Sequence, residues 1–297
     1  MGEKVARRRR FGDRADGYLL RGVDPMFRLL PFIMKKRSES AVYFTYDIDI
    51  TETERFMRDK RRTAYPGLSY THLFWAAMVR SMALHPKVNR FVAGNRVYAR
   101  RFIRLAMTVR KSRADGFKEY QIVEDFDPFA TFYEVARQFD DKMAELEVDA
   151  ADANATDRLI NLLTRGPRLL TALVVRAARC LDYFGLLPQE LARTTPFFTS
   201  AFLSNMGSLG AEAVHHHLYE LGTTTMFISA GRKRTEYVVG WDGTVEMRRL
   251  MCVKCVVDER ICNGADYAVA LTAFRHLLEH PERLLEPPEA LGVDDEL

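Results

Sequence analysis

The stretch VVDERICNGADYAVAL, residues 256–271, joins a strand to a helix and decides the fold. The residues before it alternate in polarity, as in a strand with one buried face. After Asn263 and Gly264 the apolar positions recur every three or four residues, which predicts a closing helix. The apolar face of that helix is predicted to comprise Tyr267, Ala270, Leu271, Phe274 and Leu277. Three consecutive charged residues separate the strand from the helix: Asp258, Glu259 and Arg260.

Strands and helices alternate irregularly upstream of this junction. Residues 236–257 form two strands around an Asp242-Gly243 turn, and Gly94-Asn95 marks a second hairpin. Residues 41–50, AVYFTYDIDI, alternate as a half-buried strand does. This order predicts an α/β fold with a mixed sheet. A doubly wound nucleotide-binding fold is excluded, because no glycine-rich loop joins a strand to a helix at the required place.

The composition is that of a soluble globular protein. The 297 residues are 47% hydrophobic and 28% charged, with a net charge of +4, which is too weak to indicate nucleic-acid binding. The N-terminus carries Arg7–Arg10 and has no apolar segment, so it is not a secretory signal. No window is apolar enough to span a bilayer. Four cysteines in a chain of this length do not form a disulfide framework, and the reducing cytoplasm is the expected location.

Two clusters contain potential metal ligands, but no metal site is predicted. Cys252 and Cys255 have C-x-x-C spacing, but residues three apart in a strand point to opposite faces. His215, His216 and His217 are consecutive, so at most alternate imidazoles share a side. One of these histidines, His216 or His217, is a candidate for substrate binding or for a general base in a neighbouring site.

Residues 157–187 are predicted to form two amphipathic helices, interrupted at Gly166-Pro167. Their polar positions are rich in arginine and nearly free of acidic residues: Arg158, Arg165, Arg168, Arg176 and Arg179. A basic amphipathic helix can lie on an anionic membrane surface. The alternative, which the pattern favours, is that the apolar stripe packs on the rest of the domain and the arginines face solvent.

The order of the late elements resembles a known family. FLSNMGSLG (202–210), WDG (241–243), DERICNGADYAVAL (258–271) and HPERLL (280–285) follow one another as in the catalytic domain of dihydrolipoyl acyltransferases. These proteins are the core subunits of 2-oxoacid dehydrogenase complexes and share a fold with chloramphenicol acetyltransferase. The resemblance implies a two-layer sandwich of that kind with a mixed β-sheet and, in this chain, a helical insert at about 148–195. Residues 1–24 are expected to be a basic arm, and residues 25–297 the acyltransferase-like domain.

The resemblance also implies a set of site residues. The family motif H-x-x-x-D-G, preceded by Asp and with Arg after the His, is matched by three supporting residues: Asp258, Arg260 and Gly264. Glu259 stands where the family has its general-base His, and Asn263 stands where it has Asp. The serine that stabilises the tetrahedral oxyanion in the family is matched by Ser204, with Asn205 and Gly207 beside it. The implied catalytic residues are therefore Glu259, Ser204 and Asn263.

Glu259 replaces the histidine that is the general base of the family, and this replacement changes the chemistry of the implied site. A free glutamate, with a pKa of about 4.3, is too acidic to deprotonate a thiol of pKa about 8.5 efficiently, although burial of a carboxylate can raise its pKa enough for general-base work. An amide at position 263 can hydrogen-bond to a carboxylate at 259, whereas Asp would repel it. The alternative is a structural role, in which Glu259 is a polar residue at a strand end, paired with an arginine such as Arg260.

The resemblance implies an acyl-CoA-dependent acyltransferase that transfers an acyl group from a thioester to an unidentified thiol, hydroxyl or amine. No tightly bound cofactor is expected, and coenzyme A or acyl-CoA is the substrate beside a small-molecule acceptor. A homotrimer is implied, with the active site between subunits. A lipoyl domain does not fit before residue 25, which favours a free-standing relative. The alternative is a catalytically inactive trimeric scaffold or ligand-binding relative, peripheral to the membrane through residues 157–187.

Overall fold

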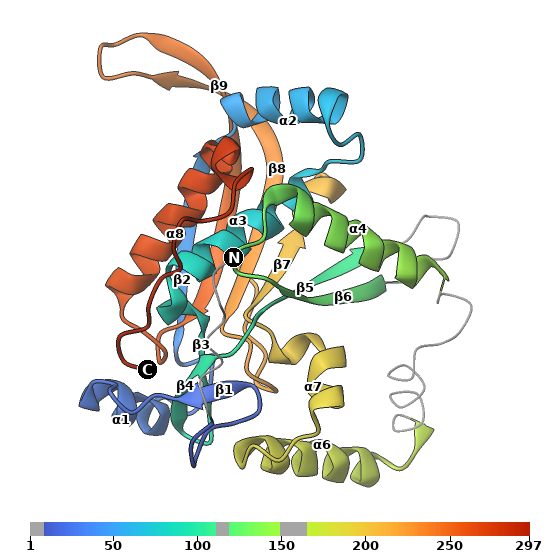
Figure 1. Cartoon of the computed structure of the whole chain (residues 1–297), viewed down its shortest axis with the longest axis vertical. Coiled ribbons are helices and arrows are strands. Elements are labelled where there is room, and N and C mark those ends of the chain that lie inside the picture. Colours follow the sequence, from blue (N-terminus) through green and yellow to red (C-terminus); the bar gives the residue numbers. More distant parts are fainter. Residues whose placement is uncertain (1–8, 111–118, 149–164) are drawn as a thin grey trace.

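The computed structural model describes residues 9–110, 119–148 and 165–297, and shows a mixed sheet covered by helices (Figure 1). The larger sheet has the strand order β2-β9-β8-β7-β5-β6. Its strands in that order are β2 (Ala41–Asp49), β9 (Val245–Asp258), β8 (Met226–Val239), β7 (Ala201–Asn205), β5 (Ile103–Arg110) and β6 (Glu119–Phe126). β7 is parallel to β5 and β8, and the other pairs are antiparallel. The predicted α/β class with a mixed sheet is confirmed.

Helices cover one face of the larger sheet and form the main core with it. They are α2 (Thr51–Thr63), α3 (Tyr70–Leu84), α4 (Phe132–Val148) and α8 (Gly264–Glu279). Trp75 of α3 is fully buried, with its ring edge-on to Phe126 and Phe139. The five apolar positions predicted for the closing helix are all buried in α8. Short 3-10 helices accompany these elements: η1 (Pro86–Asn89), η4 (Pro196–Phe198), η5 (Met206–Leu209) and η6 (Pro281–Leu284).

The opposite face of the larger sheet is partly covered by an irregular segment, residues 211–219. Leu218 of this segment packs against Phe202 and Phe227, whose rings stack at a centroid distance of 4.9 Å. Side chains alternate along a strand, so Ser204 lies on the same face as Phe202, and Leu203 points into the main core. This face, on which the described residues place no helical layer, is called the outer face below.

A small sheet lies at one end of the molecule. It has the order β1 (Gly17–Leu19), β4 (Arg96–Arg100), β3 (Arg90–Ala93), and α1 (Pro25–Ile33) contacts β4. The hairpin predicted at Gly94-Asn95 is confirmed, and both residues adopt a positive φ, of 55° and 58°. Through β1, residues 17–19 of the N-terminal segment pair with β4 and belong to this sheet.

At the other end, β8 and β9 continue beyond the body as a two-stranded arm (Figure 1). The predicted turn at Asp242-Gly243 is its tip, where Gly243 has a φ of 79°. The arm carries exposed apolar side chains, among them Tyr237, Val239 and Trp241. An isolated hairpin with exposed apolar residues is a typical surface for association.

The insert contains α6 (Arg168–Tyr183) and α7 (Gln189–Thr194), and the first of its two predicted helices, before Gly166, lies outside the described residues. The prediction that the apolar stripe packs on the domain is wrong for α6, because no residue of α6 is buried and Leu169 is 85% exposed. The C-terminal end of the helix is anchored to the body, where Arg14 binds Asp182 at 2.7 Å. None of the helices in the described residues is long and apolar enough to cross a membrane.

Candidate active site

Asp258, the last residue of β9, forms a buried ion pair with Arg260. Nε of Arg260 donates to Oδ1 of Asp258 at 2.8 Å, and Nη2 donates to Oδ2 at 2.6 Å. Burial alone would lower the pKa of Arg260, but the hydrogen bonds and charge of Asp258 raise it on balance. The interpretation that Arg260 pairs with Glu259 is therefore wrong. Glu259 and Arg260 form a turn directly after β9, and this turn brings the guanidinium of Arg260 back to Asp258.

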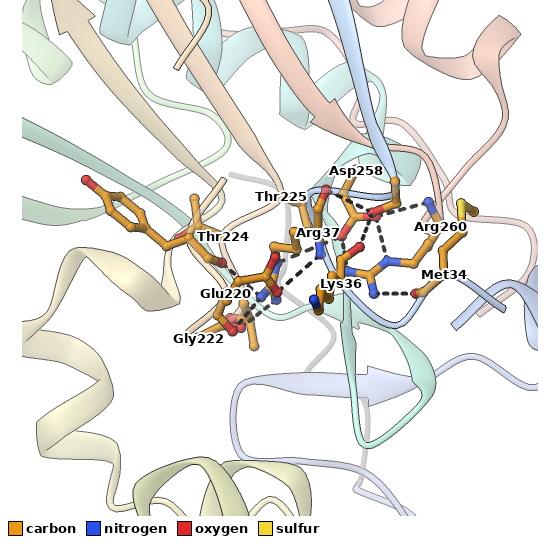
Figure 2. Close-up of polar contacts among 12 residues, drawn as sticks. Met34, Lys36, Arg37, Glu220, Gly222, Thr224, Thr225, Asp258 and Arg260 are labelled. Atoms are coloured by element: carbon orange, nitrogen blue, oxygen red, sulfur yellow. Dashed lines mark hydrogen bonds and ion pairs between the residues drawn. The ribbon is translucent and has the colours of Figure 1, made fainter. Parts of the chain in front are cut away.

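Arg37 approaches Asp258 from the other side (Figure 2). Its Nε lies 3.9 Å from Oδ2 of Asp258, and its other nitrogens donate to the carbonyls of Tyr219 and Gly222. Burial lowers the pKa of Arg37. Asp258 thus holds together the end of β9, the loop before β2 and the end of the segment on the outer face. We call Arg37, Asp258 and Arg260 the ionic cluster; its role in the fold is structural.

Glu259 lies between Asp258 and Arg260 in the chain and is fixed through its backbone. Its backbone N–H donates to the carbonyl of Ser40 at 2.9 Å, which fixes the chain beside β2. The side chain is half-buried, and no hydrogen bond or ion pair to its carboxylate occurs within the described residues. Glu259 is therefore held by its backbone while its carboxylate stays available.

Asn263 is the N-cap of α8. Its Oδ1 accepts a hydrogen bond from the backbone N–H of Asp266 at 2.8 Å, the usual role of Asn at this position. The side chain is exposed, and no hydrogen bond between Asn263 and Glu259 occurs in the described part of the chain. The expected amide–carboxylate contact is thus absent there, and the amide oxygen caps α8.

The end of β7 presents Ser204 on the outer face, beside Ser229 of β8. The following residue, Asn205, fixes this loop on both sides: its Nδ2 donates to Oγ1 of Thr71 on α3 at 3.2 Å, and its Oδ1 accepts from the N–H of Ser208 at 3.1 Å. A side chain at Gly207 would lie 2.4 Å from the carbonyl of Gly231, so only glycine fits there. The half-buried Ser204 is therefore held near the end of β7, directly before a loop that Asn205 and Gly207 fix.

The structure does not bring Ser204 and Glu259 together within one chain. Ser204 is level with Ser229, and Ser229 is level with Lys254 of β9. Glu259 is five residues further along, roughly 17 Å at 3.3 Å per residue, and two strand spacings add about 10 Å sideways. The two residues are thus roughly 19 Å apart, too far to act on the same carbonyl.

The three histidines lie on the outer face, and the rings of the two predicted site residues, His216 and His217, stack on each other. The ring of His216 stacks on Phe227 at 4.1 Å and on His217 at 4.4 Å, and both rings also contact Tyr219. Their contacts thus stabilise the segment 211–219.

His215, which sequence reasoning did not single out from its neighbours, lies over β2. Its Nε2 is 3.2 Å from Oγ1 of Thr45. Burial lowers the pKa of His215, and the nearby charge of Lys254 lowers it further. Thr45, Lys254, Ser229 and Ser204 form one row across the outer face. Only the strand register reveals this row, and no local sequence signal could have predicted it.

Comparisons with known proteins bear on the fold of the chain. Residues 197–286 match the family model for the catalytic domain of 2-oxoacid dehydrogenase acyltransferases. No curated protein sequence matches the chain.

Solved structures of acetyltransferase cores are similar to the chain. A probable dihydrolipoamide acetyltransferase from Listeria monocytogenes is 15% identical, with a TM-score of 0.56, over 87% of this chain and 93% of that one. A dihydrolipoamide acetyltransferase from Azotobacter vinelandii is 16% identical, with a TM-score of 0.57, over 89% and 93%. The cubic core of a pyruvate dehydrogenase complex is 17% identical, with a TM-score of 0.52, over 89% and 93%. The predicted acyltransferase-type fold is confirmed.

Proposed function

We propose that this protein is an acyltransferase whose active site is completed between neighbouring copies of a homotrimer. It moves an acyl group from a thioester donor, acyl-CoA, to a thiol, hydroxyl or amine. The observation that carries the proposal is the position of Ser204 near the end of β7, directly before a loop that Asn205 and Gly207 fix. A preorganised hydroxyl of this kind is what an oxyanion requires.

The chemistry follows from two side chains. The carboxylate of Glu259 takes the proton from the acceptor, whose sulfur, oxygen or nitrogen attacks the thioester carbonyl. The hydroxyl of Ser204 donates a hydrogen bond to the negatively charged oxygen of the tetrahedral intermediate. When the intermediate collapses, the carbon–sulfur bond of the donor breaks, and the proton held by Glu259 passes to the thiolate. The acyl group leaves on the acceptor, and the free thiol is the second product.

The separation of roughly 19 Å between Ser204 and Glu259 supports a shared site, because a second copy must supply one of the two residues. The arm with Tyr237 and Trp241 offers a surface that a second copy can cover. The Azotobacter relative supports the role of Asn263, because a serine, a histidine and an asparagine four residues after the histidine have a role in the catalytic mechanism of that protein. Asn263 has that spacing from Glu259. Only position 259 then departs from that set.

Complementation between variants tests the shared site. Ser204→Ala and Glu259→Gln are each expected to lower turnover of acetyl-CoA by about 100-fold or more. Co-expressed in one cell, they form mixed trimers in which some interfaces combine an intact Ser204 with an intact Glu259. Those trimers should recover a substantial part of the thiol release. If recovery is absent although mixed trimers are isolated, the site does not span two copies.

A scaffold without catalysis is the second candidate function, and one observation favours it. Of the residues matched to the motif, Asp258, Arg260 and Asn263 all serve the fold through the contacts described above. Calorimetry with coenzyme A and acetyl-CoA separates the two candidates. Binding by the wild type, altered in Glu259→Gln, supports the acyltransferase. Absence of binding by both proteins favours the scaffold.

A further inference from the structure

Helix α6 presents an apolar surface that the described chain leaves uncovered. The half-buried residues Thr171, Ala178 and Asp182 mark the side that faces the body. Leu169 and Leu173, on the opposite side, are 85% and 64% exposed. Large apolar side chains that are exposed together in this way mark a surface that binds a protein or a membrane.

A second apolar surface lies at the same end of the molecule. Figure 1 shows α1 and α6 at the end opposite to the arm, beside the small sheet. Four apolar residues of α1 are each at least half exposed: Met26, Leu29, Phe32 and Ile33. The two helices are linked through one hairpin, because α1 contacts β4 and the Nδ2 of Asn95, just before β4, is 3.5 Å from the hydroxyl of Tyr183.

The charged residues of α6 that precede Asp182 are all arginines. Residues 165–181 contain no Asp or Glu. Within the described chain, no carboxylate pairs with the arginines of α6, which are Arg168, Arg176 and Arg179. Asp182, which follows them, is neutralised by Arg14. The uncovered apolar stripe is therefore bordered by unpaired positive charge.

A hollow between α1 and β4 also combines arginines with apolar side chains, and one of these arginines, Arg21, is paired with Asp13 at 3.8 Å. The hollow has a volume of about 410 Å³, and its lining holds three arginines, apolar side chains and no carboxylate. The arginines are Arg21, Arg28 and Arg96, and the apolar side chains include Leu19, Val23 and Phe32. Arginines above an apolar floor suit a phosphate group attached to hydrocarbon.

We propose that α1, α6 and the hollow beside α1 form a docking surface for an anionic lipid bilayer. The leucines and the apolar residues of α1 enter the interface, and the arginines contact lipid phosphates. A second copy fits less well, because a two-fold contact through α6 would place Arg176 and Arg179 near their own equivalents. This surface is independent of the acyltransferase site, which lies on the larger sheet.

The full-length protein is tested by flotation with vesicles of phosphatidylcholine, with and without phosphatidylglycerol. Binding is expected only to the vesicles that contain phosphatidylglycerol, and it should weaken as salt is raised. The double variant Leu169→Glu/Leu173→Glu should bind at least tenfold more weakly. Arg176→Ala and Arg179→Ala should each weaken binding roughly fivefold.

The control is Val269→Glu, which places a glutamate at a position of α8 that is 55% exposed. It should bind vesicles like the wild type. Thermal unfolding by circular dichroism confirms that each variant is folded. Failure of the wild type to float, or equal flotation of the leucine variant, overturns the proposal. So does an assembly in solution that the leucine variant dissolves, because the surface would then be a contact between copies.

Discussion

The two ends of the larger sheet carry the two halves of the candidate site, and they hold their polar groups differently. At the β9 end, Asp258 is fully buried between Arg260 and Arg37, and its oxygens are satisfied by charged partners. At the β7 end, Ser204 is half-buried, and the bonds that fix its loop are made by Asn205. The residues matched to the family motif therefore have two kinds of role in this chain. The flanking residues of the motif maintain the fold, whereas Ser204 and Glu259 have side chains left for chemistry.

The largest effect is expected at the ionic cluster. Asp258→Ala would leave Arg37 and Arg260 buried without a carboxylate, and should lower the free energy of unfolding by roughly 3–5 kcal/mol. Chemical denaturation measures it. Glu259→Gln, one residue away, should change the free energy of unfolding by less than about 0.5 kcal/mol. Equal losses in the two variants would remove the distinction between the two sets of residues.

At the β7 end, the effect should be on rate and not on stability. Ser204→Ala should lower kcat about 100- to 1000-fold while KM and the free energy of unfolding stay near those of the wild type. Steady-state kinetics of thiol release measures both constants. Ser208→Ala, in the loop after β7 and exposed, is the control and should keep its kcat. A Ser204→Ala enzyme with normal kcat would show that the hydroxyl has no part in the reaction.

Variants of Asn263 show whether this residue maintains the fold or takes part in the reaction. Asn263→Ala removes the cap of α8 and should lower the free energy of unfolding by about 1 kcal/mol, whereas Asn263→Ser keeps a capping oxygen and most of the stability. Denaturation and kcat are measured on both variants. If Asn263→Ser keeps stability but loses turnover, the amide acts in the reaction as well as in the cap.

The smallest effect concerns pH. Burial lowers the pKa of His72 below its ordinary value, while the nearby Asp140 partly opposes this. Below about pH 6.5 the unfolded chain therefore binds this proton more readily than the folded chain, and stability falls as pH decreases through that value. Denaturation at several pH values checks this, and His72→Gln should flatten the slope. Unchanged slopes in His72→Gln would assign the effect to other groups.

Local sequence signals predicted the elements that depend on neighbouring residues. The hairpin at Gly94-Asn95 requires two residues with positive φ, and the buried face of α8 follows from helical spacing. The pairing of Asp258 with Arg260 was not predicted, because it forms across the turn that follows β9 and not along a strand.

Other features depend on residues far apart in the chain. Arg37 reaches Asp258 from more than 200 positions away, and nothing near Arg37 indicates this contact. The exposure of α6 was missed for a different reason. An amphipathic pattern predicts that one side of a helix is covered, but it does not say whether protein or lipid covers it.

The arm gives the protein a built-in optical reporter. The chain has two tryptophans, of which Trp75 is fully enclosed by the core and Trp241 stands at the tip of the arm in full contact with water. The emission of Trp75 should therefore be blue-shifted, and that of Trp241 red-shifted. Association of the arms would change only the emission of Trp241, and loss of the core would change only that of Trp75. One emission spectrum, recorded against concentration and denaturant, then separates assembly from unfolding without any label.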